Sequence, residues 1–380
     1  MTGPRSLTLD VSAVPERPGG AGYYTIAIAA GLARRDDVEV TLVARRGDEA
    51  RWHELAGGAI VRPEAPASRP GRLSFEQVGL PSLLRSLGVA LHHGPHYTMP
   101  ARSPVPCAVT IHDCTFFDHP EWHVRSKAVF FRRAIRRAAL RAGVLICVSQ
   151  VTADRLDASC RVRAPIVVAP HGVDHDRFSP VEPAAGQDRA DLEALGLPVD
   201  RPLVAYIGTL EPRKGIAPLV RAFDQVAQRQ PDPVLVLAGQ TGWGLAETER
   251  ALAAAHHADR IIRTGYLPDR AVPALLRQAA VVAYPALEEG FGLPALEALA
   301  CGTPLVTTEG TAMAEVGGAA ALLVPPGDVA ALADALDEGL AAGRGTERRN
   351  LGLAVAAERT WEASVVAHVG AYDIALAASQ

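Results

Sequence analysis

The sequence predicts an α/β protein built from two domains with parallel sheets. Short apolar runs that end in glycine, proline or polar residues alternate with helical patterns along the whole chain, as in parallel sheets connected by helices. The 380 residues are enough for two domains of ordinary size. Hydrophobic residues make up 48% and charged residues 21% of the chain, a soluble globular composition.

Charge, cysteines and hydropathy exclude several classes of function. A net charge of −4 gives no reason to expect nucleic acid. The five cysteines lack C-x-x-C spacing, which favours free thiols in a reducing cytoplasm over metal ligands. No window approaches the ~20 apolar residues of a membrane span, and the N-terminal region does not have a signal-peptide pattern. We therefore expect a cytoplasmic protein.

The first domain opens with a strand at residues 7–12, a glycine loop, and a helix at residues 23–33. A glycine loop between strand and helix can hold a phosphate, but Gly20 and Gly22 stand outside any G-x-G-x-x-G spacing and no P-loop lysine follows. Glycines that serve only a tight turn explain the loop equally well. A second strand is expected at residues 38–43, and a short helix from Pro81 to Gly88.

Histidines cluster at the next two strand ends. His92, His93 and His96 suggest zinc, but adjacent residues of an extended chain point to opposite sides and no carboxylate completes a ligand set. Residues 107–111 form a buried strand, and His112 and Asp113 follow at its carboxyl end, where ligand sites collect in parallel sheets. On the residues alone, His112 either orients a ligand or acts on a proton, or is satisfied by local backbone.

A strongly basic helix is expected over Arg125–Arg141. Its five central and C-terminal arginines recur on neighbouring faces and are interleaved with Phe130, Phe131 and Ile135. Such a helix either presents a solvated face or docks on anionic lipid or a phosphate-bearing acceptor. Strands follow at residues 144–148 and 166–168, and residues 181–191, rich in proline, alanine and glycine, are typical of an interdomain linker.

The second domain opens with a strand at residues 203–208 and a loop that carries Arg213 and Lys214 before a helix. Two adjacent cations at such a turn can clamp a diphosphate, since arginine offers a planar fork and lysine a point charge. Solvated loop charges are the alternative. Further strands are expected at residues 234–238, 261–264 and 322–324, and a final helix at residues 361–377.

The most informative stretch is residues 281–306, which has the pattern strand, loop, helix, strand. Pro294 suits the first turn of a helix running to Gly302, so Gly290 and Gly292 lie where free backbone N–H groups can meet an anion. Glu289 and Glu297 are eight residues apart and suit hydroxyl groups, for example those of a ribose and a hexose.

The run Glu289-Gly-Phe-Gly-Leu-Pro-Ala-Leu-Glu297, with Ala-Cys-Gly-Thr-Pro behind it, resembles the E-x7-E signature of retaining, nucleotide-sugar-dependent glycosyltransferases of family 4. The run Gly208-Thr-Leu-Glu-Pro-Arg-Lys214 is similar to that family's phosphate loop; one departure is Gly215, where relatives often carry asparagine. The resemblance implies the GT-B fold, in which two Rossmann-like parallel-sheet domains face an interdomain cleft. Here these would be an acceptor-side domain (1–178), a nucleotide-sugar domain (179–360) and a last helix (361–380) crossing back to the first domain.

The resemblance also implies roles for individual residues. His112, Glu289, Arg213 and Lys214 would be catalytic. Donor contacts would come from Gly208, Thr209, Gly265, Tyr266, Gly290, Phe291, Gly292, Leu293 and Glu297. The candidates for a phosphate or acceptor contact are Gly20, Gly22 and His93. No metal and no cofactor are expected: Asp174-His175-Asp176 matches the D-x-D metal motif formally, but the resemblance assigns this segment to the end of the first domain.

The implied reaction is transfer of a hexose from a nucleoside diphosphate sugar to an acceptor hydroxyl with retention. GDP-mannose is the first candidate donor and UDP-glucose the second. The acceptor is a glycan, a lipid-linked molecule or a small metabolite, and the helix Arg125–Arg141 is a candidate contact with the inner face of the plasma membrane. A non-catalytic GT-B protein that binds a nucleotide sugar is the alternative; an epimerase of the same fold fits the motifs less well.

Overall fold

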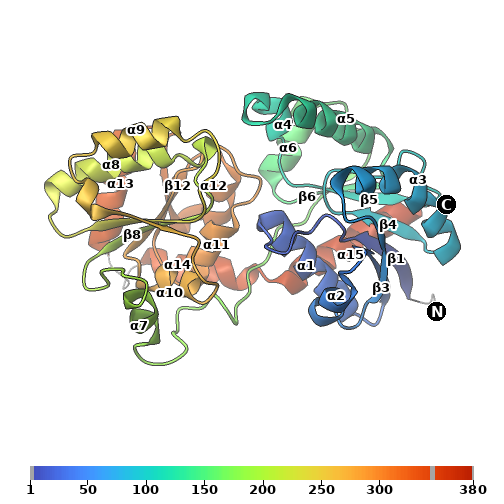
Figure 1. Cartoon of the computed structure of the whole chain (residues 1–380), viewed down its shortest axis with the longest axis horizontal. Helices are drawn as coiled ribbons and strands as arrows, with labels where there is room; N and C mark the ends of the chain where they lie inside the picture. The colour runs from blue at the N-terminus through green and yellow to red at the C-terminus, as the bar shows by residue number, and fades with distance from the viewer. Residues whose placement is uncertain (1–3, 343–346, 379–380) are drawn as a thin grey trace. The chain divides into compact units, whose positions relative to one another are not determined.

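The computed structural model describes residues 4–342 and 347–378, and within them the chain forms two compact units (Figure 1). Unit 1 comprises the chain up to Gly172 together with the segment from Trp361 onward, and unit 2 comprises Val173–Thr360. Each unit contains one sheet in which all the strand pairs are parallel. The expected α/β class with two Rossmann-like sheets is confirmed.

The sheet of unit 1 has seven strands in the order β3-β2-β1-β4-β5-β6-β7. These strands are β1 (Arg5–Asp10), β2 (Val38–Arg45), β3 (Ile60–Ala65), β4 (Leu91–Gly94), β5 (Cys107–Ile111), β6 (Val144–Cys147) and β7 (Ile166–Val168). Every residue of β4, β5 and β6 is buried, because helices cover both faces of a parallel sheet. The strand order reverses between β1 and β4, so this is where a ligand crevice is expected.

The helices of unit 1 are α1 (Gly20–Ala33), α2 (Glu49–Leu55), α3 (Arg69–Leu87), α4 (Thr115–Asp118), α5 (Arg125–Arg141), α6 (Gln150–Ser159) and α15 (Trp361–Ala377), with a 3₁₀ turn η1 (Pro120–Trp122). The prediction of a short helix opening at Pro81 is wrong. Helix α3 begins at Arg69, where the Ser68 side chain accepts a hydrogen bond from the Gly71 N–H, and it continues through Pro81. The N-cap outweighs the helix-breaking tendency of the internal proline.

Helix α15 belongs to unit 1, although it follows unit 2 in sequence. It contacts α1 and strand β6, and Figure 1 shows it in red beside the blue N-terminal elements. Its buried residues Val365, Val369 and Tyr372 join the same hydrophobic core as Leu7 and Leu9 of β1. The polar residues buried on the same helix matter for the site described below.

The sheet of unit 2 has six strands in the order β10-β9-β8-β11-β12-β13. These are β8 (Leu203–Ile207), β9 (Val234–Ala238), β10 (Ile261–Gly265), β11 (Val281–Tyr284), β12 (Leu305–Thr308) and β13 (Ala321–Val324). The strand order reverses between β8 and β11, so the loops that leave these two strands meet at the carboxyl edge of the sheet.

The helices of unit 2 are α7 (Gln187–Glu193), α8 (Ile216–Arg229), α9 (Ala246–Ala254), α10 (Ala271–Gln278), α11 (Leu293–Ala300), α12 (Ala312–Gly317), α13 (Val329–Ala342) and α14 (Glu347–Glu358), with 3₁₀ turns η2 (Pro212–Lys214), η3 (Ala258–Arg260) and η4 (Gly318–Ala320). No described helix has both the length and the apolar character to cross a bilayer.

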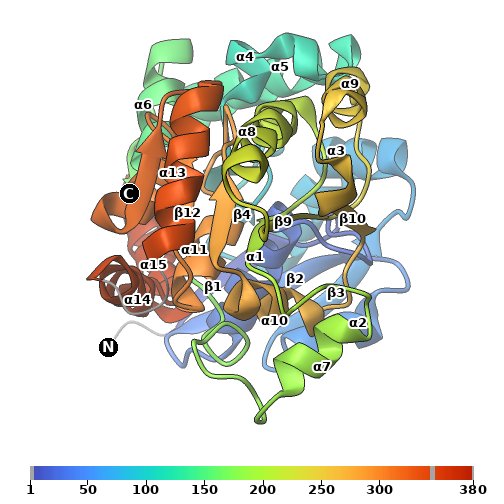
Figure 2. The same ribbon diagram turned by 90° about the vertical axis from the view of Figure 1, so that its left-hand side faces the viewer.

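The segment at residues 181–191 is part of unit 2 and is not a free linker. Its second half forms α7, which lies beside α10 (Figure 2). There the Asp188 carboxylate accepts two hydrogen bonds from Arg277, at 2.6 and 2.8 Å, and both side chains are buried. A buried bidentate pair of this kind fixes the segment, and composition alone does not predict it.

The division between the units also falls before Val173, whereas the sequence placed it after Phe178. Val173 N–H donates to the carbonyl of Arg359 at 2.9 Å, and Arg177 donates to the carbonyl of Asp269 at 3.1 Å. Backbone and side-chain bonds therefore attach residues 173–178 to unit 2.

Candidate functional site

Two loops carry the predicted donor site in unit 2, one after β8 and one after β11. Their backbones are joined, since Leu287 N–H donates to the carbonyl of Arg213 at 2.8 Å. Gly215 lies between η2 and α8 with φ +69°, and a Cβ there would come within 2.0 Å of the Pro285 carbonyl oxygen. The residue at this position therefore has to be glycine for the two loops to approach this closely.

Arg213, Lys214 and Glu289, three of the predicted catalytic residues, lie together at this edge. The Lys214 ammonium is buried against Oε1 of Glu289 and donates to the Tyr284 hydroxyl at 2.8 Å. The Arg213 guanidinium lies 3.3 Å from Oε2 of Glu289 and donates to the Glu288 carbonyl at 3.3 Å. One carboxylate thus holds both cations in a fixed arrangement.

Tyr284 and Glu211 complete the group, and the sequence reasoning missed both. The Tyr284 hydroxyl donates to Oε1 of Glu289 at 3.2 Å, while Glu211 accepts a 2.8 Å hydrogen bond from Nε of Arg213. Burial raises the pKa of the Tyr284 phenol above its ordinary value, so the hydroxyl stays protonated and can donate. The available signals were a tyrosine as the last residue of β11 and a glutamate two positions before Arg213.

Helix α11 begins at Leu293, so Pro294 lies in its first turn as expected, and Gly292 is its N-cap in the left-handed region at φ +91°. A Cβ on Gly292 would lie 2.4 Å from Cγ of Met313, so α12 packs directly against this turn. The Phe291 side chain is buried.

Glu297 lies on the second turn of α11 and is half-buried. Desolvation raises its pKa to about 7, and the charge of Arg177 opposes this shift in part. The other predicted donor contacts lie at the carboxyl ends of β8 and β10. Thr209 and Tyr266 are exposed, and Gly265 has φ +68° with no atom within 4 Å of the position of a Cβ.

His112 is a predicted site residue that follows β5 in unit 1. Aromatic rings surround its imidazole. Nε2 of His112 donates to the Pro95 carbonyl at 2.8 Å. Burial lowers its pKa, an effect that the Pro95 carbonyl and Asp113 oppose, so the neutral ring has an unprotonated Nδ1. Within the described residues no hydrogen-bond partner is assigned to Nδ1, and this atom can accept a bond from a hydroxyl.

His93 does not fit the predicted acceptor contact. Its side chain is 0% exposed, and its two ring nitrogens are hydrogen-bonded to Tyr372 at 2.9 Å and to Thr110 at 2.8 Å. An acceptor would have to break both bonds to reach the ring. The prediction from the strand-end position is therefore corrected: His93 belongs to the interior of unit 1.

The glycine loop of unit 1 also differs from its prediction. Helix α1 starts at Gly20, three residues before Tyr23, with Gly19 as the N-cap residue. Gly22 is buried, and a Cβ there would lie 2.7 Å from Cβ of Pro18, so this glycine serves close packing. Gly20 is exposed at the helix start and stays a candidate contact.

Across residues 4–342 and 347–378, no three His, Cys, Asp or Glu side chains are arranged to hold an ion. His92, one of the three histidines that suggested zinc, is buried with Nδ1 2.9 Å from the Thr8 hydroxyl.

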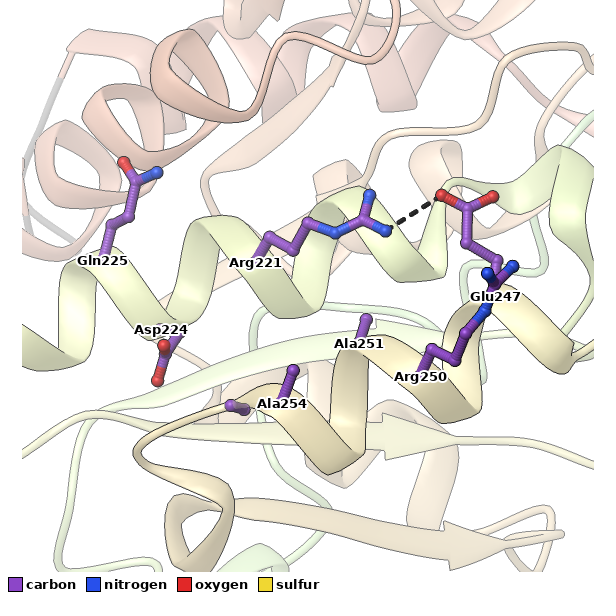
Figure 3. A pocket seen from close by; sticks show the side chains of 8 residues that line it. Arg221, Asp224, Gln225, Glu247, Arg250, Ala251 and Ala254 are labelled. Atoms are coloured by element: carbon purple, nitrogen blue, oxygen red, sulfur yellow. Dashed lines mark hydrogen bonds and ion pairs between the residues drawn. The ribbon is translucent and has the colours of Figure 1, made fainter.

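An open groove of about 480 Å³ lies elsewhere on unit 2, between α8 and α9 (Figure 3). Arg221 and Glu247 face each other across it at 3.0 Å, and Asp224 and Arg250 also line it. None of the predicted site residues belongs to this groove.

Comparison with known proteins agrees with this arrangement. Residues 18–177 match the family model described as Glycosyltransferase Family 4, and residues 187–353 match the model described as Glycosyl transferases group 1. The two matches together cover most of the chain and contain His112, Arg213, Lys214, Glu289 and Glu297, whereas helix α15 lies outside both. The chain belongs to the family 4 glycosyltransferases of GT-B fold and is a hexosyltransferase.

Individual relatives carry more specific names. The chain is 29% identical over 299 residues to the O-antigen chain mannosyltransferase B of Escherichia coli, covering 77% of this chain and 76% of that one. It is 34% identical over 239 residues to the D-inositol 3-phosphate glycosyltransferase of Mycobacterium bovis, covering 59% of this chain and about half (49%) of the relative.

Solved structures share the fold. Sucrose-phosphate synthase from Thermosynechococcus elongatus superposes with a TM-score of 0.76 at 23% identity, over 98% of this chain and 100% of that one. Anabaena HepE in complex with UDP-glucose has a TM-score of 0.73 at 20% identity, over 96% and 99%. At these identities the likeness establishes the GT-B fold alone.

Proposed function

We propose that the protein moves a hexose from a nucleoside diphosphate sugar to an acceptor hydroxyl with retention at the anomeric carbon. The observation that carries this proposal is the convergence of Arg213, Lys214 and Glu289 at the strand-order reversal of unit 2, beside the first turn of α11. The family matches support a nucleotide sugar as donor. We propose which nucleotide sugar it is, the retention of configuration and the absence of a metal requirement.

The proposed chemistry follows from where charge develops. As the bond between sugar and phosphate breaks, negative charge builds on the β-phosphate and the sugar becomes oxocarbenium-like. Arg213 supplies a planar fork and Lys214 a point charge for that phosphate, and the positive end of α11 adds to them. These groups perform the task that a divalent metal performs in other transferases, so we propose a metal-independent reaction. The acceptor oxygen bonds to the anomeric carbon on the face that the leaving phosphate vacates as the bond between sugar and phosphate breaks, and the leaving phosphate takes up the proton of the acceptor hydroxyl.

The remaining residues are proposed to hold the donor. Glu289 accepts hydrogen bonds from sugar hydroxyls, Glu297 from the ribose, and the unprotonated Nδ1 of His112 from one sugar hydroxyl. Mannose is the first candidate because the Escherichia coli relative is named a mannosyltransferase. Glucose is the second, since HepE was solved with UDP-glucose.

The first experiment fixes the nucleotide and then the chemistry. A thermal-shift panel of GDP, UDP and ADP identifies the ligand that raises the melting temperature, and turnover of the matching mannose and glucose donors is then measured with and without EDTA. We expect EDTA to leave turnover unchanged, and Lys214→Ala and Glu289→Ala each to lower it by about 100-fold or more.

Arg221→Ala provides the matched control, because it removes an exposed cation from α8 of the same unit. Full turnover in Lys214→Ala and Glu289→Ala would refute the site assignment. Loss of turnover on chelation would refute metal independence. Nucleotide binding without turnover on any donor and acceptor would instead support a non-catalytic binding protein.

We also propose that α5 contacts an anionic membrane surface, which would suit a lipid-linked acceptor over a free glycan or small metabolite. Arg133, Arg137 and Arg141 are exposed at four-residue intervals on this helix, which contains no acidic residue. Val129 and Leu140 are also exposed on it, at 47% and 43%. A basic face with exposed apolar side chains is the pattern of helices that lie at a lipid interface.

A further inference from the structure

Six polar groups form a buried hydrogen-bonded chain through unit 1. Tyr372 of α15 bonds to Nδ1 of His93 at 2.9 Å, and Nε2 of His93 bonds to the Thr110 hydroxyl at 2.8 Å. The Thr110 hydroxyl lies 2.7 Å from the Tyr24 hydroxyl, which lies 2.7 Å from Nε2 of His368.

The chain ends where Nδ1 of His368 donates to the Ser364 carbonyl at 2.7 Å. The four elements α1, β4, β5 and α15 contribute to it. The five side chains that take part, in addition to the Ser364 carbonyl, are all buried.

The direction of every proton in the chain follows from its last bond. A carbonyl only accepts, so Nδ1 of His368 carries the hydrogen. Burial lowers the pKa of His368 to about 4, so at neutral pH Nε2 is unprotonated and must accept from the Tyr24 hydroxyl. Having given its one hydrogen to His368, Tyr24 must accept from Thr110.

The same reasoning continues to the other end. Since Thr110 donates to Tyr24, its oxygen accepts from Nε2–H of His93, and Nδ1 of His93 then accepts from the Tyr372 hydroxyl. Burial holds the pKa of His93 well below its ordinary value, so a ring with one hydrogen is the expected state. Each of the five side chains therefore donates one hydrogen bond to the next group, and all the bonds run in one direction, from Tyr372 to the Ser364 carbonyl.

This chain of hydrogen bonds affects His112 because the Tyr24 ring packs against the His112 ring. The two rings meet edge to face with centroids 5.0 Å apart, at an interplanar angle of 84°. Tyr97 packs on the same ring at 5.5 Å. The hydroxyl of Tyr24 is held from both sides, so its ring cannot turn away from His112. Thr110, the other partner of Tyr24, lies two residues before His112 and carries the chain into the strand that leads to it.

We propose that Tyr24 and His368 are positioning residues for His112, so that the C-terminal helix fixes the ring that is proposed to bind the donor sugar. This inference rests on the proposed role of His112. It assigns to α15, a helix outside both family matches, a part in the orientation of a site residue. Neither Tyr24 nor His368 is required to touch the substrate.

A double-mutant cycle tests the proposal on the full-length enzyme. Tyr24→Phe keeps the ring and removes the hydroxyl, and we expect it to lower kcat by about tenfold while the affinity for the free nucleoside diphosphate, measured by calorimetry, stays unchanged. In a His112→Ala background the same substitution should lower kcat by less than about twofold, because the effects of residues that act through one another do not add.

Conservative rescue gives a second readout. His368→Ala should lower kcat as Tyr24→Phe does, whereas His368→Gln places an acceptor near the position of Nε2 and should recover part of it. Tyr372→Phe is the matched control, since it deletes the same hydroxyl group at the far end of the chain and should lower the melting temperature with kcat retained. Equal losses from Tyr24→Phe with and without His112, or an equal loss from Tyr372→Phe, would overturn the proposal.

A readout without substrate separates this inference from the proposed function. Ring ¹⁵N spectra of the unliganded protein report the tautomer of His112 directly. Tyr24→Phe should change the His112 signals and Tyr372→Phe should leave them in place, even if no donor is turned over. Unchanged His112 signals in Tyr24→Phe would refute the positioning role independently of any activity.

Discussion

At the scale of the residue, the two cations of the donor site are already balanced by carboxylates. Arg213 is paired with Glu211 and Glu289, and Lys214 with Glu289, so two positive and two negative charges meet at one strand edge. A diphosphate is therefore not attracted by a large net charge. If the proposed site is correct, its recognition of a diphosphate depends on the direction of the arginine fork and of the lysine N–H groups, which the carboxylates hold.

Glu297 is expected to give the proposed donor site a pH dependence. Its pKa of about 7 in the unliganded protein means that much of this side chain is protonated at neutral pH. A ribose whose hydroxyls donate to the carboxylate favours the charged form, so binding lowers the pKa and releases a proton. We expect the affinity for the nucleotide sugar to rise with pH through about 7, by at most about tenfold per pH unit.

Calorimetry in two buffers of different ionisation enthalpy measures the released proton. The intact nucleotide sugar is the suitable probe, because its diphosphate is esterified at both ends and has no proton to exchange in this range. Glu297→Gln is the control and should show a flat profile with no proton release. Proton release that persists in Glu297→Gln would assign the effect to another group.

At the scale of the element, local sequence patterns predicted the bounds of a helix or strand where its own residues determine its structure. The strands Cys107–Ile111, Ile166–Val168 and Val234–Ala238 and the helix Arg125–Arg141 have the bounds that the sequence predicted. Prediction failed where a distant partner decides. Helix α7 was mistaken for linker because its stability depends on Arg277, which lies 89 positions from Asp188.

Helix α5 carries a prediction about membranes. With its exposed arginines near an anionic surface, each basic residue contributes about 1 kcal/mol of attraction. Arg133→Glu combined with Arg141→Glu should therefore lower binding to phosphatidylglycerol and phosphatidylcholine vesicles by at least about tenfold in a sedimentation assay, and raised salt should weaken the wild-type binding as well.

The matched control reverses two charges in unit 2, at Arg221 and Arg250, which line the open groove between α8 and α9 (Figure 3). This variant has the same net charge as the α5 variant and should bind vesicles like the wild type. Equal losses in both variants would mean that total charge and not α5 governs binding. Absence of binding to anionic vesicles by the wild type would remove the membrane proposal.

At the scale of the whole molecule, the sequence order of the parts differs from their order in space. The hydrogen bond between His93 and Tyr372 joins residues 279 positions apart, and the bond between Tyr24 and His368 spans 344. A strand-end histidine and a C-terminal tyrosine carry no pattern that connects them, which is why His93 was predicted to meet the acceptor. Arg213, Lys214 and Glu289 could be grouped as one predicted site, because each lies between a strand and a helix in a short run that resembles a motif of the family.

The buried histidines of unit 1 are expected to make it the more acid-sensitive of the two units. Burial lowers the pKa of six histidines there, to about 4 for His92 and His368, to about 3 for His96, and below the ordinary value for His93, His112 and His171. Their ordinary pKa is about 6.5, so below that pH the unfolded chain binds more protons than the folded one, and the free energy of unfolding falls as the pH falls.

Carboxyl groups with a raised pKa act in the opposite direction. Glu76, with a pKa of about 7, and Asp10 lie in unit 1, but they are two groups against six histidines. In unit 2, Glu297 favours the folded state as the pH falls below 7, and Asp224, whose pKa is lowered to about 2, loses its contribution only below its ordinary pKa of about 3.8.

Hydrogen exchange read by mass spectrometry should therefore show that peptides of β4, β5 and α15 lose protection between pH 7.5 and 5.5, after correction for the intrinsic rate, while peptides of β8 and β9 keep theirs. Equal loss in both units, or loss confined to unit 2, would contradict a stability set by the buried histidines. His368→Gln should reduce the loss at α15, because one neutral side chain then no longer gains a proton on unfolding.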